Sequence, residues 1–81
     1  MKLPMHFVPY AESLHINLLT DDIRFLEKMV SRAPQDDRRP ILNSYLQLWV
    51  EVLRENPGPG GNNAGRHAAN CWLRSLLDEQ E

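Results

Sequence analysis

Few residues of this chain could do chemistry by type and spacing, and the closest pair is His67 and Cys71. A separation of four residues places both side chains on one face of a helix, where a thiolate and imidazole pair could form. Catalysis would also need a third group to orient the imidazole, and Cys71 lies at the edge of a mostly polar face without such a partner. We therefore interpret Cys71 as a small, semi-buried thiol beside a surface histidine.

Motifs that define enzymes and metal sites are absent from the sequence. It has no Gly-x-Ser-x-Gly, no His-Glu-x-x-His and no Cys-x-x-Cys, and His6, His15 and His67 lack the spacing of metal ligands. The acidic pairs at 21–22 and 36–37 occur where the cap and first turn of a helix favour negative charge. We expect a protein that is not an enzyme and that uses no cofactor and no metal.

A cationic face near the C-terminus is the strongest candidate for a binding surface. It consists of Arg66, His67, Asn70 and Arg74, and we expect both arginines to be exposed. Arg66 and His67 fall in the first turn of the expected helix, where positive charge opposes the helix dipole at a cost of about 0.3 to 1 kcal/mol. An anion docked there would use these charges and the free backbone N–H groups. This face is predicted to bind an acidic partner surface or a phosphate group; the alternative is an ordinary solvated face.

Amphipathic helices must position these residues, and we expect one all-α (mainly α) domain over residues 1–81. Capping residues, prolines and glycines divide the chain into an extended or turn segment, three helices and a Gly/Pro linker. In chain order these are the segment 1–19, the helices 20–33 and 37–56, the linker 57–62 and the helix 63–78. Thr20 is the expected N-cap of the first helix, and Asp36 or Asp37 that of the second, with Pro40 in its first turn.

The helix at 37–56 is predicted to be the central one, because its polar residues occupy only about a third of its circumference. Such a wide apolar arc needs cover from two directions. The cover is either both other helices, or one of them and a second copy of the chain. Trp49 lies within this arc and is a predicted core residue.

Residues 13–18 alternate polar and apolar side chains, which favours a short, half-buried strand. Leu14 and Leu18 would also suit a helical turn, so both readings stay open. A strand would need a neighbour, either residues 5–8 folded back as a hairpin or the same strand of another subunit.

The order of strand, helix, turn and longer helix over residues 13–56 resembles the ribbon-helix-helix DNA-binding fold. The resemblance implies a dimer whose paired strands place alternate polar side chains in the major groove. The corresponding DNA contacts here are Ser13, His15 and Asn17, with Arg38 and Arg39 as further cations. The sequence departs from that pattern, because the turn at 33–40 is long and the strand carries no lysine or arginine.

Composition excludes several other classes. The chain has 81 residues, of which 42% are hydrophobic and 25% charged, which is average for a soluble single domain. Its one cysteine cannot form an internal disulfide, so we expect a reducing compartment, the cytoplasm. No apolar run approaches the roughly 18 residues of a membrane span, and no signal peptide is expected. The net charge of −2 gives no overall attraction to nucleic acid or membranes.

These observations favour a non-catalytic protein–protein interaction module. We expect a small regulator or inhibitor of a larger protein machine, of the kind that mobile genetic elements encode, with a protein as its partner and no membrane association. The alternative is a dimeric DNA-binding regulator, for which a homodimer and a nucleic-acid partner are required.

Overall fold

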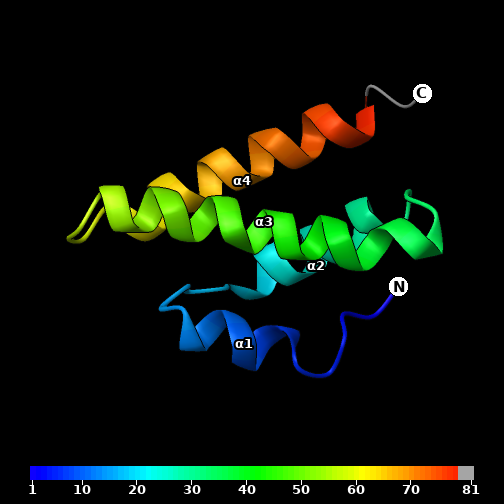
Figure 1. Ribbon diagram of the computed structural model, residues 1–81, viewed down its shortest axis with the longest axis horizontal. Coiled ribbons are helices and arrows are strands. Elements are labelled where there is room, and N and C mark those ends of the chain that lie inside the picture. Colours follow the sequence, from blue (N-terminus) through cyan, green and yellow to red (C-terminus); the bar gives the residue numbers. More distant parts are fainter. Residues whose placement is uncertain (79–81) are drawn as a thin grey trace.

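The computed structural model describes residues 1–78, and in that part of the chain every regular element is a helix (Figure 1). The helices are α1 (Phe7–Ser13), α2 (Thr20–Val30), α3 (Gln35–Glu55) and α4 (Gly61–Asp78). The all-α prediction is confirmed, with one helix more than expected. The last three residues of the expected domain lie outside the described residues. None of the described helices is both long enough and apolar enough to cross a membrane.

Helix α3 runs through the middle of the molecule, with α4 antiparallel along one side, α1 on the other, and α2 behind it in this view (Figure 1). It packs most extensively against α4 and also contacts α2. The expected central helix is therefore covered by both of the other predicted helices. The α3 side chains buried in the core are Ile41, Leu42, Tyr45, Leu46, Trp49 and Val50.

Helix α1 occupies part of the segment that the sequence analysis assigned as extended. Phe7 and Ala11 are four residues apart and both are buried, so one face of a short helix contributes to the core. Pro9 is the third residue of α1, where a backbone N–H has no acceptor within the helix, so its ring costs no hydrogen bond.

Of the two readings left open for residues 13–18, the short strand is wrong, because α1 ends there in a Schellman motif. The His15 N–H donates to the carbonyl oxygen of Glu12 at 3.0 Å, and the Ile16 N–H to that of Ala11 at 3.0 Å. His15 has a φ of 66°, in the left-handed region where this motif usually has glycine. Buried Ile16 joins the same core as Ala11. The alternation of polar and apolar residues therefore follows from a helix end.

Helix α2 ends at Val30, earlier than the predicted residue 33. The Arg38 guanidinium donates to the carbonyl oxygens of Ser31 at 3.1 Å and Ala33 at 3.0 Å. These bonds satisfy backbone acceptors of the turn that follows the helix, so the chain can leave the helix before the predicted end.

Helix α3 begins at Gln35 with Pro34 as N-cap, earlier than the predicted residue 37. Asp36 and Asp37 therefore lie in its first turn and neither is the cap, although negative charge is favourable in both positions. Pro40 lies inside the helix rather than in its first turn. Its missing N–H leaves an exposed part of the helix with one backbone bond fewer.

Helix α4 begins at Gly61, earlier than the predicted residue 63, and buried glycines bring it close to α3. A β-carbon at Gly65 would lie 2.5 Å from Cδ1 of Trp49 and 2.8 Å from the Trp49 carbonyl oxygen. A β-carbon at Gly61 would lie against the carbonyl oxygen of Asn56. Only glycine fits this helix spacing at both positions.

We expect Gly65→Ala to lower the free energy of unfolding by about 1 to 3 kcal/mol, because the buried Trp49 ring and backbone cannot move aside freely. Gly60→Ala is the matched control, since no atom lies within 4 Å of a β-carbon there. That control should be neutral or stabilising by about 0.4 to 1 kcal/mol. Urea unfolding followed by circular dichroism compares the two, and equal stabilities would contradict the close approach at Gly65.

Candidate functional site

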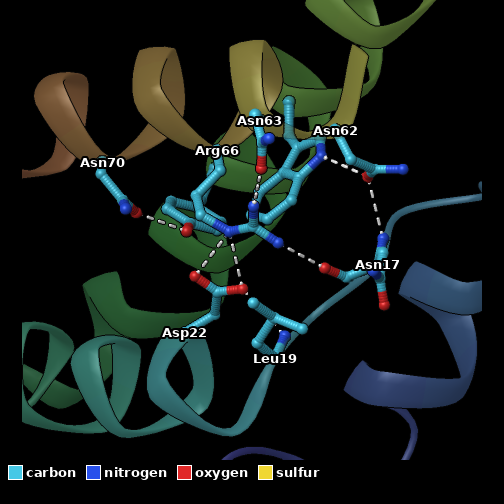
Figure 2. Close-up of polar contacts among 9 residues, drawn as sticks. Asn17, Leu19, Asp22, Asn62, Asn63, Arg66 and Asn70 are labelled. Atoms are coloured by element: carbon cyan, nitrogen blue, oxygen red, sulfur yellow. Dashed lines mark hydrogen bonds and ion pairs between the residues drawn. The ribbon is translucent and has the colours of Figure 1, made fainter. Parts of the chain in front are cut away.

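Arg66 of the predicted binding face is directed into the protein rather than toward solvent (Figure 2). Its Nε lies 2.9 Å from Oδ2 of Asp22 in α2, and its Nη2 donates to the carbonyl oxygen of Asn17 at 2.8 Å. Its guanidinium carbon lies 5.0 Å from the centre of the Trp49 ring, a cation–π distance. The side chain is only 18% exposed. The expectation of an exposed Arg66 is wrong, because a buried acid on another helix pairs with it.

The anion that Arg66 meets is therefore Asp22 of the same chain. The Asp22 side chain is 6% exposed and its Oδ2 also accepts a hydrogen bond from the Leu19 N–H at 2.8 Å. Leu19, not Thr20, is the N-cap of α2. One carboxylate thus fixes the start of α2 and joins it to α4.

Hydrogen bonds of Asn62 link the connection between α1 and α2 to the start of α4 (Figure 2). Its Oδ1 accepts from the Asn17 N–H at 2.9 Å and from the Trp49 Nε1–H at 3.1 Å. Its Nδ2 donates to the His15 carbonyl oxygen at 3.4 Å. Together with Arg66, it forms a polar cluster that holds an irregular segment against the two longest helices.

Asn70 of the predicted face also points inward, where its Oδ1 accepts a hydrogen bond from the Tyr45 hydroxyl at 2.6 Å. Burial raises the pKa of that hydroxyl well above its ordinary value of 10.0, the Asp22 carboxylate raises it further, and Arg66 partly opposes both. The Tyr45 hydroxyl is therefore a neutral donor inside the structure.

This shift gives a pH prediction. Above a pH of about 10 the unfolded chain releases the Tyr45 proton while the folded chain keeps it, so the unfolded state binds fewer protons and stability falls as pH rises. Tyr45→Phe removes that contribution, so the stability advantage of the unmodified protein over Tyr45→Phe should shrink between neutral pH and pH of about 11. Chemical unfolding at several pH values measures it, with exposed Tyr10→Phe as control. A constant difference would contradict it.

The other two residues of the predicted face are exposed. Nε2 of His67 lies 3.7 Å from Sγ of Cys71, and the Arg74 guanidinium lies 5.1 Å from the centre of the Phe25 ring. The structure therefore divides the predicted face: two members stabilise the fold, and two remain on the surface.

The residues predicted to contact DNA do not share a strand. Ser13 ends α1 and its hydroxyl donates to the Tyr10 carbonyl oxygen, while His15 and Asn17 lie in the irregular connection. In α3, the Arg38 guanidinium is bonded to backbone carbonyls of the turn after α2, and Arg39 is exposed. The strand on which the ribbon-helix-helix resemblance depends is absent from residues 1–78.

A groove between the N-terminal segment and α3 was missed by the sequence analysis, which assigned residues 1–19 to an extended or turn segment. One hollow of this groove has a volume of about 240 Å³ and is lined by Pro4, His6, Phe7, Tyr10, Arg39, Leu42 and Asn43. A neighbouring hollow shares Pro4, Arg39 and Leu42 with it and adds Met1, Lys2, Gln35 and Arg38. We call these two hollows together the α1/α3 groove. The helical spacing of Phe7 and Ala11 was the one signal in the sequence that could have predicted α1 beside this groove.

Exposed apolar side chains accompany this groove. Tyr10, which lines it, is 54% exposed, and Met5, which lies between two lining residues in the chain, is 86% exposed. Large apolar groups left in water at a concave site are typical of a binding surface.

No group of three or more His, Cys, Asp or Glu side chains within residues 1–78 could hold a metal ion. The exposed His67 and Cys71 pair has no third side chain bonded to the imidazole in the same part of the chain. Comparison with protein families, with characterised proteins and with solved structures gave no match to this chain.

Proposed function

We propose that this chain is a non-catalytic protein–protein interaction module that acts in the cytoplasm as a small regulator or inhibitor of a larger protein machine, of the kind that mobile genetic elements encode. The observation that carries the proposal is the α1/α3 groove, an open apolar hollow beside the exposed side chains of Tyr10 and Met5. Exposed apolar area of this kind raises the free energy of an isolated protein, and burying it on association lowers that free energy.

The polar network supports the same reading. Arg66 of α4 is bonded to Asp22 of α2, and Asn70 of α4 to Tyr45 of α3, so these well-connected polar groups join the helices of the fold. Binding surfaces are commonly carried by such rigid scaffolds.

DNA binding through paired strands has no observation in its favour. Residues 13–18 form a helix end and an irregular connection, and the Arg38 guanidinium is bonded to backbone carbonyls. We therefore prefer a protein partner to the DNA-binding alternative.

The experiment that tests the proposal is capture from source-cell lysate with the tagged full chain, with and without nuclease, followed by mass spectrometry. We expect a defined protein to be retained in both conditions. Retention that disappears with nuclease would favour the nucleic-acid alternative, and retention of no specific protein from lysate would overturn the proposal.

A further inference from the structure

We infer that the α1/α3 groove receives a short acidic segment of the partner protein, with one apolar side chain in the hollow and a neighbouring carboxylate paired with Arg39. This inference rests on the proposed function and adds the place and chemistry of binding. The size of the hollows and the positive charge of the groove favour a peptide segment as the occupant.

The hollow fits a side chain rather than a whole ligand. Its volume of about 240 Å³, like that of the neighbouring hollow, lies below the roughly 300 to 1,000 Å³ of single pockets that enclose small molecules. Phe7 and Leu42 are core residues that reach its surface, and Tyr10 supplies an exposed aromatic ring. Aromatic residues of this kind contribute strongly to peptide and protein binding, because they bury large apolar area.

The charges around the groove have one sign. Lys2, Arg38 and Arg39 are its lysine and arginine side chains, and no carboxylate is among its lining residues. Asp36 and Asp37, which precede these arginines in the chain, do not line either hollow. A cationic groove on a chain of net charge −2 is complementary to an acidic segment.

Arg39 is the cation best placed to pair with a partner. The Arg38 guanidinium is already bonded to two carbonyl oxygens of the preceding turn. Arg39 is exposed, and within residues 1–78 its side chain makes no hydrogen bond or ion pair. Its planar guanidinium can bind a carboxylate through two N–H donors.

A nucleic acid fits these features less well. Nucleic-acid sites follow a phosphate backbone with a row of cations over several nucleotides, whereas this groove combines a compact apolar floor with a few cations.

The test is selection of short random peptides, displayed on phage, against the intact protein, followed by fluorescence polarisation with labelled copies of the enriched peptides. We expect enrichment of sequences in which Asp or Glu flanks a large apolar residue. Arg39→Glu should weaken their binding by about tenfold or more, a loss of roughly 1.4 kcal/mol or more. Arg24→Glu makes the same charge change at an exposed α2 residue outside the groove and should have little effect.

A second variant tests the apolar contact. Tyr10→Ala should also weaken peptide binding by about tenfold. Leu19→Ala, which removes a side chain 49% exposed elsewhere, should leave it unchanged. Thermal unfolding of each variant shows that the fold is kept.

The inference would be overturned by enrichment without acidic residues, by equal peptide affinity of Arg39→Glu and Arg24→Glu, or by Arg39-dependent binding of a labelled random-sequence oligonucleotide in place of peptides. Arg39-dependent self-association in sedimentation would also overturn it, because the occupant would then be a second copy. If the Arg39→Glu variant captures the same protein from lysate equally well, the proposed function stands, but the α1/α3 groove is not the binding site. If capture retains no protein, the proposed function is wrong, whatever the peptide experiment shows.

Discussion

Replacing Trp49 with alanine is expected to cost about 3 to 5 kcal/mol of unfolding free energy, the range for removing a large aromatic side chain from a core. Trp49 is fully buried, and its ring packs edge to face on Tyr45 with centroids 5.9 Å apart. The contacts of its ring with α4, through Gly65, Asn62 and Arg66, would be lost together. Because the total free energy of unfolding of a small domain is only about 5 to 15 kcal/mol, the variant should be partly or wholly unfolded.

Urea unfolding monitored by circular dichroism measures this loss, with Trp72→Ala as the matched control. Trp72 is half-buried on α4, so its removal should cost clearly less. Trp49→Phe keeps an aromatic ring and removes the Nε1–H donor to Asn62, so it should fall between the two. A Trp49→Ala loss no larger than that of Trp72→Ala would contradict the central position of Trp49.

The helices of the core could be predicted because their apolar residues repeat with the period of a helix. Leu26, Met29 and Val30 are buried as the pattern predicts, and so is Trp49. Helix ends could not be placed to the residue, since the structure uses Leu19 and Pro34 as N-caps, where sequence preference favours Thr, Ser, Asp or Asn.

Helix α1 could not be predicted because its signals are weak and mixed. It has only seven residues and includes Pro9, and its end uses His15 where glycine is usual. Tertiary contacts of Phe7 and Ala11 stabilise it, and these are invisible to a local pattern.

The candidate site was predicted in part for a similar reason. A helical wheel shows that Arg66 and Asn70 are polar, but it cannot show which other element lies against them. The predicted anion site depended on Arg66 lying in the first turn of a helix, but α4 begins at Gly61, so Arg66 lies beyond that turn and pairs with Asp22 of the same chain. Nothing local to Asp22 distinguished it from an ordinary helix-start acid.

Breaking the Asp22 and Arg66 pair is the second large effect that we expect. Asp22→Ala removes the acceptor of both the Arg66 guanidinium and the Leu19 N–H, and it leaves a largely buried cation over Trp49. Removing one partner of a buried pair costs about 3 to 5 kcal/mol, and the 18% exposure of Arg66 places this pair toward the lower end. The loss is measured by urea unfolding at neutral pH.

A double-mutant cycle separates the pair from its surroundings. Arg66→Met keeps an apolar stem over Trp49, so Asp22→Ala with Arg66→Met should cost less than the sum of the single changes. Arg32 and Asp78 form the matched exposed pair, with side chains 42% and 58% exposed, and Arg32→Met should cost no more than about 1 kcal/mol. Additive losses would mean that Asp22 acts only on α2. The attachment of the α1–α2 connection to α4 would then come from the bonds of Asn62 and from the Arg66 bond to the Asn17 carbonyl oxygen, because none of these bonds uses Asp22.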